Sequence, residues 1–497
     1  MQDKQRAPAG SSSGRHRRRY DSTLPKALWA ALLLAGCGFG GTPLRLLPEN
    51  PHYFEYHGRP TILLTSGEHY GAVINANFDF PRYLATLESD HLNLTRIFSG
   101  AYREVPGNFD IEGNTLAPTA EQFVAPWARS RQSGAADGGN KFDLSKWNKA
   151  YFRRLKAFVR EAALHGVIVE VNLFCPFYED TMWEVSPMNG KNNINRIGHV
   201  KRMEVYTLHN KGLTELQMGL TRKIVSELQA FDNVYFEICN EPYFGGVTLA
   251  WQKQIAVAIG GAEKKNRVHL ISQNIANFRE KIREFVPEAS VLNFHYVRPP
   301  ITVAENYGLN RVIGNNETGF DGSRDDVYRI QAWDFLMAGG GLFNNLDYSF
   351  TADHENGTAP ISAKTPGGGG VEYRKQLRIL MDTFRGLPFA RMHPANDEVH
   401  ISVEGGRQPQ ALVLPGAVYA AYIHHATVRN EAPHVSVDNG PHHTEVTFRL
   451  QPGTYHLTWI EPKTGRELGS RMVQASADPV KILSPEYHED VAVLVKK

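Results

Sequence analysis

The chain has 497 residues, of which 42% are hydrophobic and 21% are charged. These values are typical of globular proteins and exclude long disordered stretches, while the length predicts a large domain with a smaller one beside it. The formal net charge is +2, but the first 36 residues carry +5. With that segment set aside, the rest of the chain carries −3, which argues against a nucleic-acid partner.

The first 36 residues have the pattern of an export signal. A basic arm, RHRRRY, precedes an apolar run from Ala27 to Gly36 that is too short to span a bilayer as a finished helix. Leu34 to Cys37 resembles a bacterial lipobox, in which the signal is cut before the cysteine and the thiol carries lipid. The resemblance implies a signal peptide over residues 1–36, a lipid anchor at Cys37 and, because Gly38 follows, an outer-membrane location in the cell envelope. A plain secretory signal with an incidental cysteine is the alternative.

After a linker over residues 37–43, short β-branched runs alternate with longer segments of helical period as far as residue 390. Strands are predicted at residues 61–65, 92–98, 167–174, 233–239, 267–272, 290–296, 311–315 and 340–345. Eight strands separated by helices predict a (β/α)8 or TIM barrel over residues 44–390. A turn at His57 and Gly58, before the first of these strands, predicts a small hairpin that floors the barrel.

Two further patterns complete the predicted organisation. Long polar insertions follow the second, third and eighth strands, at residues 99–143, 176–208 and 350–372, and such connections line the active face of a barrel. Residues 391–497 change to short alternating strands with turn signals and no helical period. The chain is therefore predicted to be an α/β barrel followed by a small all-β sandwich.

Two carboxylates stand at predicted strand ends. Glu241 follows the fourth strand in FEICNEPYF, and Glu317 ends the seventh in VIGNNETGF. The ends of barrel strands carry the chemistry of this architecture, so the two side chains are expected to face each other across the cavity. A separation of about 5 to 5.5 Å defines a retaining glycosidase and a wider gap an inverting one. The sequence leaves that distance open.

Asn-Glu-Pro after the fourth strand, with a second glutamate after the seventh, resembles clan A of the retaining glycoside hydrolases, which includes the family 5 cellulases and mannanases. The resemblance covers roughly residues 44–387. It implies that Glu241 is the general acid/base, that Glu317 is the nucleophile and that Asn240 binds the sugar 2-hydroxyl. Arg96 matches the clan's arginine beside the nucleophile, and its charge is expected to keep Glu317 ionised while Glu241 holds its proton.

The sequence departs from family 5 at two places. His295 and Tyr296 are adjacent where the family has His-x-Tyr, so both can face the cavity only if the strand has become a turn there. The strand-eight tryptophan is absent, and Asn345 stands in that region. The remaining substrate-binding candidates are His69 and Tyr70 after the first strand, Asn172 on the third and Trp183 in a long loop, for which anchoring its own loop is the alternative role.

These features predict an exported β-glycoside hydrolase that acts on a plant or microbial polysaccharide or oligosaccharide by a two-glutamate retaining mechanism. No cofactor or metal is expected, because metal-dependent barrels need His-x-His after the first strand and His69 stands alone. The expected partners are a carbohydrate and, through Cys37, a membrane. The alternatives are a catalytically inactive glycan-binding surface lipoprotein and an inverting glycosidase. The sugar, the linkage, and endo or exo action are not determined by the sequence.

Overall fold

A computed structural model describes residues 41–402, 409–428 and 434–497. The predicted signal peptide, Cys37 and part of the predicted linker lie outside the described residues. Within the described ranges, no helix combines the length and the hydropathy needed to cross a membrane.

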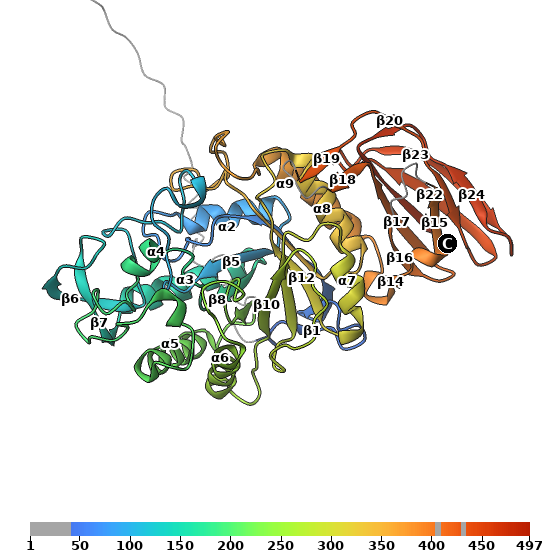
Figure 1. Ribbon diagram of the computed structural model, residues 1–497. Helices are drawn as coiled ribbons and strands as arrows, with labels where there is room; N and C mark the ends of the chain where they lie inside the picture. Colours follow the sequence, from blue (N-terminus) through green and yellow to red (C-terminus); the bar gives the residue numbers. More distant parts are fainter. Residues whose placement is uncertain (1–40, 403–408, 429–433) are drawn as a thin grey trace, which may run out of the picture. The chain divides into compact units, whose positions relative to one another are not determined.

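The predicted eight-stranded parallel barrel is confirmed (Figure 1). Its strands are β4 (Leu63–Gly67), β5 (Leu94–Phe98), β8 (Ile168–Asn172), β9 (Val234–Glu237), β10 (Ile271–Asn277), β11 (Val291–His295), β12 (Val312–Glu317) and β13 (Leu342–Leu346). They are hydrogen-bonded in the order β4-β13-β12-β11-β10-β9-β8-β5. The one strand that is displaced is β10, which was predicted at 267–272. It continues through the residues QNIAN, with a register shift between Asn274 and Ala276. Because these residues are mostly polar, the apolar pattern of the sequence does not mark the second half of the strand.

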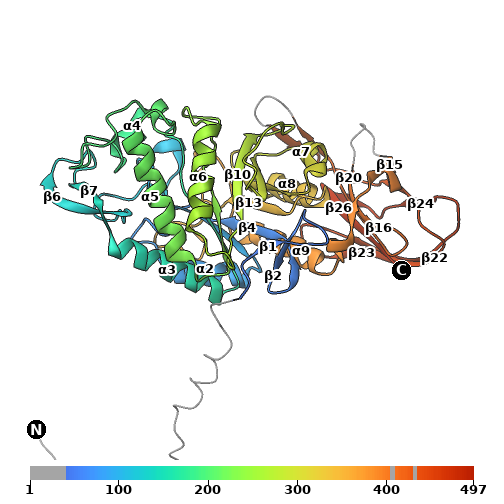
Figure 2. The same cartoon turned by 90° about the horizontal axis from the view of Figure 1, so that it is seen from below.

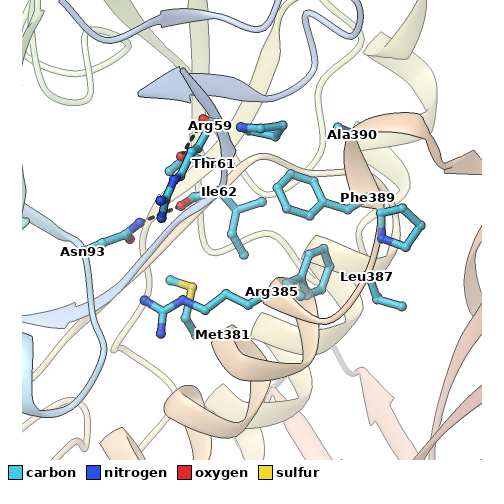
Figure 3. Close-up of a pocket in the computed structure, with 12 residues that line it drawn as sticks. Arg59, Thr61, Ile62, Asn93, Met381, Arg385, Leu387, Phe389 and Ala390 are labelled. Carbon is cyan, nitrogen blue, oxygen red and sulfur yellow. Dashed lines mark hydrogen bonds between the residues drawn. The ribbon is translucent and has the colours of Figure 1, made fainter. Parts of the chain in front are cut away.

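The seam between β4 and β5 is closed by an asparagine side chain. Asn93 donates its Nδ2 hydrogen to the Ile62 carbonyl at 2.8 Å (Figure 3). Its Oδ1 accepts a hydrogen bond from the Leu64 amide at 2.9 Å. Its own amide bonds the Leu64 carbonyl. Asn93 therefore supplies the cross-strand hydrogen bonds where the two strands share no ladder, and β4 is held beside β5 as barrel closure requires.

The helices surround the barrel, and Figure 2 shows α3, α5 and α6 along one side of it. They are α2 (Phe80–Ser89), α3 (Lys149–Leu164), the short α4 (Asp180–Val185), α5 (Lys211–Leu228), α6 (Leu249–Ala262), α7 (Ile301–Asn306), α8 (Asp325–Met337) and α9 (Val371–Arg385). In α3 the side chain of Asn148 caps the first turn, and Gly166 follows at φ 67°. Its apolar repeat is buried against the barrel, as the 3.6-residue period predicts.

The hairpin of β2 (Phe54–Tyr56) and β3 (Arg59–Thr61) closes the floor of the barrel, with β1 (Arg45–Leu46) beside it. His57 at φ 51° and Gly58 at φ 72° form its two-residue turn. Phe54 packs in one buried cluster with residues near the start of several barrel strands, which are Leu63, Leu94, Ile168, Tyr235, Val291, Val312 and Leu342. The floor is therefore dry, and a ligand can enter the barrel only from the opposite end.

The long insertion after β5 contains structure that the sequence did not indicate. A hairpin of β6 (Trp127–Ser133) and β7 (Asn140–Trp147) lies within it, and Trp127 stacks on Trp147 at its base. Between β5 and this hairpin, the connection passes over the open end of the barrel as a loop with a single 3-10 turn at Asn108–Asp110.

The C-terminal region forms two antiparallel sheets and smaller two-stranded pairings. A six-stranded sheet has the order β14-β16-β17-β26-β22-β23, and a three-stranded sheet has the order β15-β21-β24. The bounds are β14 (His393–Pro394), β15 (Val399–Ser402), β16 (Gln410–Leu414), β17 (Val418–His424), β18 (Ala426–Val428), β19 (Val435–Val437), β20 (Pro441–His442), β21 (Glu445–Phe448), β22 (Gly453–Ile460), β23 (Glu467–Ala475), β24 (Val480–Leu483), β25 (Tyr487–His488) and β26 (Asp490–Lys496).

The middle of the six-stranded sheet, at β17 and β26, is buried on both faces. Along β17, Ala420 and Tyr422 belong to the cluster that includes the barrel helices, whereas Tyr419, Ala421 and Ile423 pack toward the three-stranded sheet. Trp333 of α8 stacks on Tyr422 with ring centroids 5.4 Å apart. This double burial explains the continuous apolar runs of β17 and β26, because neither alternate set of side chains faces water.

A buried ion pair joins α8 to β26. The guanidinium of Arg329, 1% exposed, donates from Nε and Nη2 to the two carboxylate oxygens of Asp490 at 2.9 and 3.0 Å. It also donates to Gln376 at 2.7 Å and to Glu489. This fork geometry satisfies most of the donors of a buried arginine.

Replacing Arg329 with Met is expected to lower the free energy of unfolding by about 3 to 5 kcal/mol, because Asp490 stays buried without its counter-charge. Urea denaturation of the purified protein measures it. Arg378→Met is the matched control, since Arg378 makes an exposed pair with Asp382 and should change stability by less than about 1 kcal/mol. Equal losses in the two variants would contradict the prediction.

Candidate active site

Glu241 and Glu317 meet at the open end of the barrel, after β9 and at the end of β12. Both residues are buried, each with 6% of its surface exposed. The ring of His295 lies between the two carboxylates. His295 Nδ1 is 3.1 Å from Oε1 of Glu241 and 3.5 Å from Oε1 of Glu317. One oxygen of each carboxylate and a ring nitrogen of His295 all lie within 4.8 Å of one another. The two carboxylates that the sequence placed at strand ends therefore face each other across a narrow gap.

Left-handed backbone at the strand ends turns these side chains into the cavity. Tyr70, Glu241 and Tyr296 have φ values of 60°, 36° and 55°, which L-residues other than glycine rarely adopt. Such conformations are costly and persist where the surrounding structure fixes them. At Tyr296 the turn has the consequence expected from the sequence, since β11 ends at His295 and the adjacent rings both reach the carboxylates.

Three donors converge on the carboxylate of Glu317. Tyr70 donates its hydroxyl to Oε2 at 2.8 Å, and Arg96 donates from Nη1 to the same oxygen at 3.3 Å. Tyr296 donates its hydroxyl to Oε1 at 2.5 Å. Together these three donors fix the position and the orientation of the Glu317 carboxylate at the mouth of the barrel.

Glu241 is surrounded by a different set of donors. Tyr178 donates its hydroxyl to Oε2 at 2.5 Å, and His295 and Tyr243 bond Oε1 at 3.1 and 3.3 Å. Burial raises the pKa of Glu241, but the hydrogen bond and charge of His295, with the bonds from Tyr178 and Asn277, outweigh burial and hold that pKa below its ordinary value. The sequence-based expectation that Glu241 holds its proton because little compensates its charge is therefore wrong.

A buried polar cluster lies under the two carboxylates, inside the barrel. Arg96 is 2% exposed and pairs through Nη2 with Glu237 and, at 2.7 Å, with Oδ1 of Asn240. Its Nε is 3.7 Å from Glu170, which is fully buried. Burial and the charge of neighbouring Glu237 raise the pKa of Glu170 to about 8. Burial also acts to raise the pKa of Glu237, but Arg96, together with Asn293, Glu170 and His295, outweighs it and lowers that pKa. Glu170 is thus a neutral acid at pH 7 that hydrogen-bonds its ionised neighbour.

The carboxylates open into a pocket of about 240 Å³. Its walls come from loops after six of the barrel strands. Of the sequence-based candidates, His69, Tyr70, Asn240, Tyr296 and the two glutamates line it, together with Phe98, Glu104, Phe109, Leu116, Cys175, Tyr178, Phe244, Asn277 and Phe320. Tyr178 and Glu104 were missed because each lies in a long loop, where no strand periodicity marks which side chains turn inward.

Five predicted substrate-binding residues do not line the pocket. Arg96 and His295 are buried and contact the carboxylates directly, whereas the other three lie away from them. Trp183 is 4% exposed, packs on Phe177 and donates its indole N–H to the Val200 carbonyl at 3.0 Å, so it anchors its own loop. Asn345 is buried beneath the site and bonded to Thr318. Asn172 is also fully buried, and neither polar atom of its side chain has a partner among the described residues.

Among the described residues, one group of three has the composition of a metal-ligand set, and it is Glu241, His295 and Glu317. These are the side chains that already exchange hydrogen bonds with one another and with the surrounding tyrosines. The guanidinium of Arg96, 3.3 Å from Glu317, places a fixed positive charge next to any cation bound there. Like charges at that distance oppose metal binding, so the group is better suited to proton transfer and nucleophilic attack.

A second hollow, of about 600 Å³, lies at the floor end of the barrel between β3 and the end of α9 (Figure 3). Apolar side chains such as Ile62, Met381 and Phe389 line most of it, and Arg59 and Arg385 stand at its rim. No carboxylate, histidine or cysteine belongs to its lining. This hollow therefore offers no side chain that could act as an acid or a nucleophile.

Comparisons with known proteins agree with this architecture. A family model described as "Domain of unknown function (DUF6298)" matches residues 110–208, which include the β6–β7 hairpin and α3. No curated protein matches the sequence.

The fold is similar to those of solved glycoside hydrolases. One structure titled "Glycoside hydrolase" aligns over 92% of this chain and 97% of its own, with a TM-score of 0.62 and 11% identity. A glycoside hydrolase family 5 protein from Bacteroides vulgatus aligns over 92% of both chains, with a TM-score of 0.61 and 12% identity. A putative glycoside hydrolase from the same organism aligns over 93% and 84%, with a TM-score of 0.60 and 12% identity. At these identities the likeness is one of fold.

The neutral state of Glu170 predicts a measurable pH dependence of stability. The folded protein keeps a proton on this side chain to about pH 8, whereas the unfolded chain releases it near pH 4.5. The contribution of this proton to the free energy of unfolding is fully present below pH 4.5. It is lost as the pH rises toward 8, by up to about 1.4 kcal/mol per pH unit. Glu170→Gln has no proton to lose, so it should become the more stable protein, relative to wild type, as the pH increases.

Urea unfolding of both proteins from pH 5 to pH 8 measures this difference, and Glu184→Gln, at an exposed position, is the control. Parallel pH profiles for the wild type and Glu170→Gln would show that Glu170 is ionised in the folded protein.

Proposed function

We propose that the protein is a retaining β-glycoside hydrolase. The observation that carries the proposal is the Glu241 and Glu317 pair, with one oxygen of each carboxylate within 4.8 Å of the other. Carboxylates about 5 to 5.5 Å apart leave no room for a water between nucleophile and sugar, whereas an inverting site needs about 6.5 to 9.5 Å. The barrel shared with known glycoside hydrolases supports the same reaction class.

Glu317 is proposed as the nucleophile. Its carboxylate attacks the anomeric carbon and forms a glycosyl ester. At the same time the bond from that carbon to the leaving oxygen breaks, and the oxygen keeps both bonding electrons. Arg96, Tyr70 and Tyr296 stabilise the ionised starting state. They also hold the two oxygens in place, so that little reorganisation is needed as the charge passes to the ester.

Glu241 is proposed as the acid and then the base. It gives a proton to the leaving oxygen and then takes one from the water that hydrolyses the ester. The lowered pKa of Glu241 suits the second step. For the first step, a sugar that fills the pocket excludes water from a carboxylate that is already 6% exposed, and further desolvation raises its pKa toward the protonated form.

Asn240 is positioned for the sugar's 2-hydroxyl. Arg96 donates to its Oδ1 at 2.7 Å, and its Nδ2 hydrogen points to the Tyr178 hydroxyl at 2.9 Å. These bonds fix which end of the amide is the donor. A 2-hydroxyl becomes a stronger donor as the sugar ring becomes oxocarbenium-like, so a hydrogen bond that it donates to Oδ1 of Asn240 would be stronger in the transition state than in the ground state.

The proposed location is the cell envelope, with a lipid anchor at Cys37. The support is the basic arm and apolar run of residues 1–36 followed by the lipobox-like tetrapeptide. An enzyme anchored in this way meets glycans outside the cytoplasm. A diacyl thioether and an N-acyl chain together exceed the marginal binding of one acyl chain.

Glu317→Gln is expected to lower kcat by at least about 1000-fold on any β-glycoside that the wild type cleaves, because the amide cannot form the ester. The wild type should accumulate a covalent adduct with a 2-deoxy-2-fluoro-β-glycoside, and mass spectrometry should place it on the peptide containing Glu317. Anomeric inversion measured by NMR, without an adduct, would replace the retaining mechanism with an inverting one. If the wild type binds glycans without cleaving any, the protein is a glycan-binding protein and not an enzyme. If EDTA abolishes activity, the reaction depends on a metal ion.

Glu241→Gln separates the acid from the nucleophile. A dinitrophenyl leaving group needs no proton, so formation of the glycosyl ester from such a substrate should be slowed little in this variant. Substrates with an alkoxide leaving group should be cleaved at least about 100-fold more slowly. An equal loss on both classes would contradict the assigned role.

Lipidation is tested by expressing the full chain with Cys37→Ser. The wild type is expected in the membrane fraction with incorporated radiolabelled palmitate, and the variant without label. A wild type without label in a bacterial host with lipoprotein processing would favour the plain secretory signal.

A further inference from the structure

The pocket has room for one sugar. Its volume of about 240 Å³ equals the share of liquid occupied by about eight waters. It also lies below the range of about 300 to 1,000 Å³ that holds drug-sized ligands. A single pyranose ring with its hydroxyls fits this space, and a second ring on the same side does not.

The positions of the two carboxylates define which side holds that ring. The nucleophile must lie against the anomeric carbon, and the acid must lie toward the leaving group. The released part of the substrate therefore extends over Glu241, and the retained sugar lies toward Glu317 and the loop that carries His69 and Tyr70. Tyr70 bonds Glu317 directly, and its ring stacks beside His69 at 5.4 Å.

A buried carboxylate ends the pocket on the retained-sugar side. Glu104 is 4% exposed, lies in the lining, and accepts hydrogen bonds from His69 Nε2 at 3.1 Å and from Asn114 Nδ2 at 2.5 Å. The Tyr102 hydroxyl is 3.3 Å from its Oε1. His69 Nε2 also lies 3.2 Å from Oε1, so its single hydrogen is shared between the two oxygens. Three donors therefore hold a carboxylate that has about four acceptor positions, which leaves capacity for a ligand hydroxyl. Burial alone would lower the pKa of His69, but Glu104 raises it, and the resulting pair balances much of the charge of Glu104.

The wall that carries Glu104 is joined firmly to its neighbour. The hydroxyl of Thr115, in the same loop, donates to Glu68 at 2.5 Å, and Glu68 accepts the amides of Gly71 and Ala72 at 2.9 and 3.0 Å. At Gly71 any Cβ would lie 2.1 Å from the Thr115 carbonyl oxygen, so the two loops touch through bare backbone. This contact leaves no gap for a longer chain to pass.

The opposite side has the character of an open platform. Tyr243 and Phe244, directly after Glu241 and Pro242, are 39% and 44% exposed, and Phe278 nearby is 51% exposed. Phe244 also lines the pocket beside Tyr178, with ring centroids 5.8 Å apart. Exposed aromatic faces on the leaving-group side can stack on sugars of varied number and kind.

We propose that the enzyme acts from the non-reducing end and releases one neutral sugar at a time, with Glu104 binding a hydroxyl of that terminal sugar. The inference rests on the glycosidase function proposed above and specifies its substrate class. Glu104 can accept a hydrogen bond from a sugar hydroxyl but would repel a second carboxylate placed against it, so a terminal uronic acid is disfavoured at that position.

The wild-type protein tests the direction of attack. Cello-, manno-, galacto- and laminaripentaose, labelled at the reducing end, are incubated with enzyme alongside the same compounds capped by a 4,6-O-benzylidene group on the terminal sugar. Exo action predicts that the first products are a free monosaccharide and a labelled tetrasaccharide, and that the capped chains resist cleavage. Labelled di- or trisaccharides at the earliest times, or internal cleavage of a capped chain, would overturn the inference while leaving the glycosidase function intact.

The role of Glu104 is tested on the aryl β-glycoside that the wild type cleaves best. Glu104→Gln should lower kcat/KM by about 10- to 100-fold, the effect of weakening one hydrogen bond to a charged group. Glu112→Gln, at an exposed position of the same loop, should leave kcat/KM unchanged. Hydrolysis of aryl monoglycosides also supports a one-sugar pocket. If no glycoside of either kind is cleaved, the proposed function fails and this inference fails with it.

Deoxy substrates distinguish contact from support. If Glu104 binds a sugar hydroxyl, one of the 3-, 4- and 6-deoxy glycosides should be a poor substrate for the wild type and should show little further loss with Glu104→Gln. A variant that loses the same factor on every deoxy substrate would show that Glu104 only supports the loop.

Discussion

The site depends on one buried cation. Arg96 lies inside the barrel, where an unpaired guanidinium could not be tolerated, and it is accommodated because carboxylates from three other strands surround it. The same contacts place Glu317 and orient the amide of Asn240. A single charge therefore links the interior of the barrel to both the nucleophile and the group that faces the sugar. Removing it would leave ionised carboxylates with no counter-charge in a dry environment.

Around this cation, the strand ends supply donors by leaving regular β geometry. The left-handed turns at Tyr70, Glu241 and Tyr296 bring phenol and carboxyl groups into hydrogen-bonding distance, which straight strands would point to opposite faces. In a cavity with little water these hydrogen bonds act at low effective dielectric and are correspondingly strong. The strained backbone is therefore what places the hydrogen-bond donors around the carboxylates.

The architecture was predictable because it depends on the spacing of apolar residues along the chain. All eight barrel strands, the floor hairpin and the two carboxylates at strand ends follow from alternation, helical repeats and turn residues. Strand β23 carries little sequence signal, because its residues are mostly exposed and mixed in polarity. The lowered pKa of Glu241 was not predictable either, because it depends on the position of His295, a contact between residues 54 apart in the chain.

Loop residues were the other limit. Trp183 was expected at the pocket because indoles stack on sugars, yet the same apolar ring is more stable buried under its loop with its N–H bonded to Val200. Glu104, by contrast, carries no local signal, and its place in the pocket follows from the contact between two loops at Gly71 and Thr115. Which loop residue turns inward is decided by tertiary contacts that a sequence pattern does not contain.

The sheet whose middle strands are buried on both faces bears on how this chain can be divided. Because β17 contributes alternate side chains to the barrel-side cluster and to the sandwich interior, cutting the chain before β14 would uncover Trp333 and the neighbouring face of α8. Such a fragment would expose an aggregation-prone apolar surface, and Arg329 would lose its ion pair with Asp490. The C-terminal region is therefore a poor candidate for a module exchanged freely between enzymes, and barrel and sandwich are expected to be inherited, expressed and lost together.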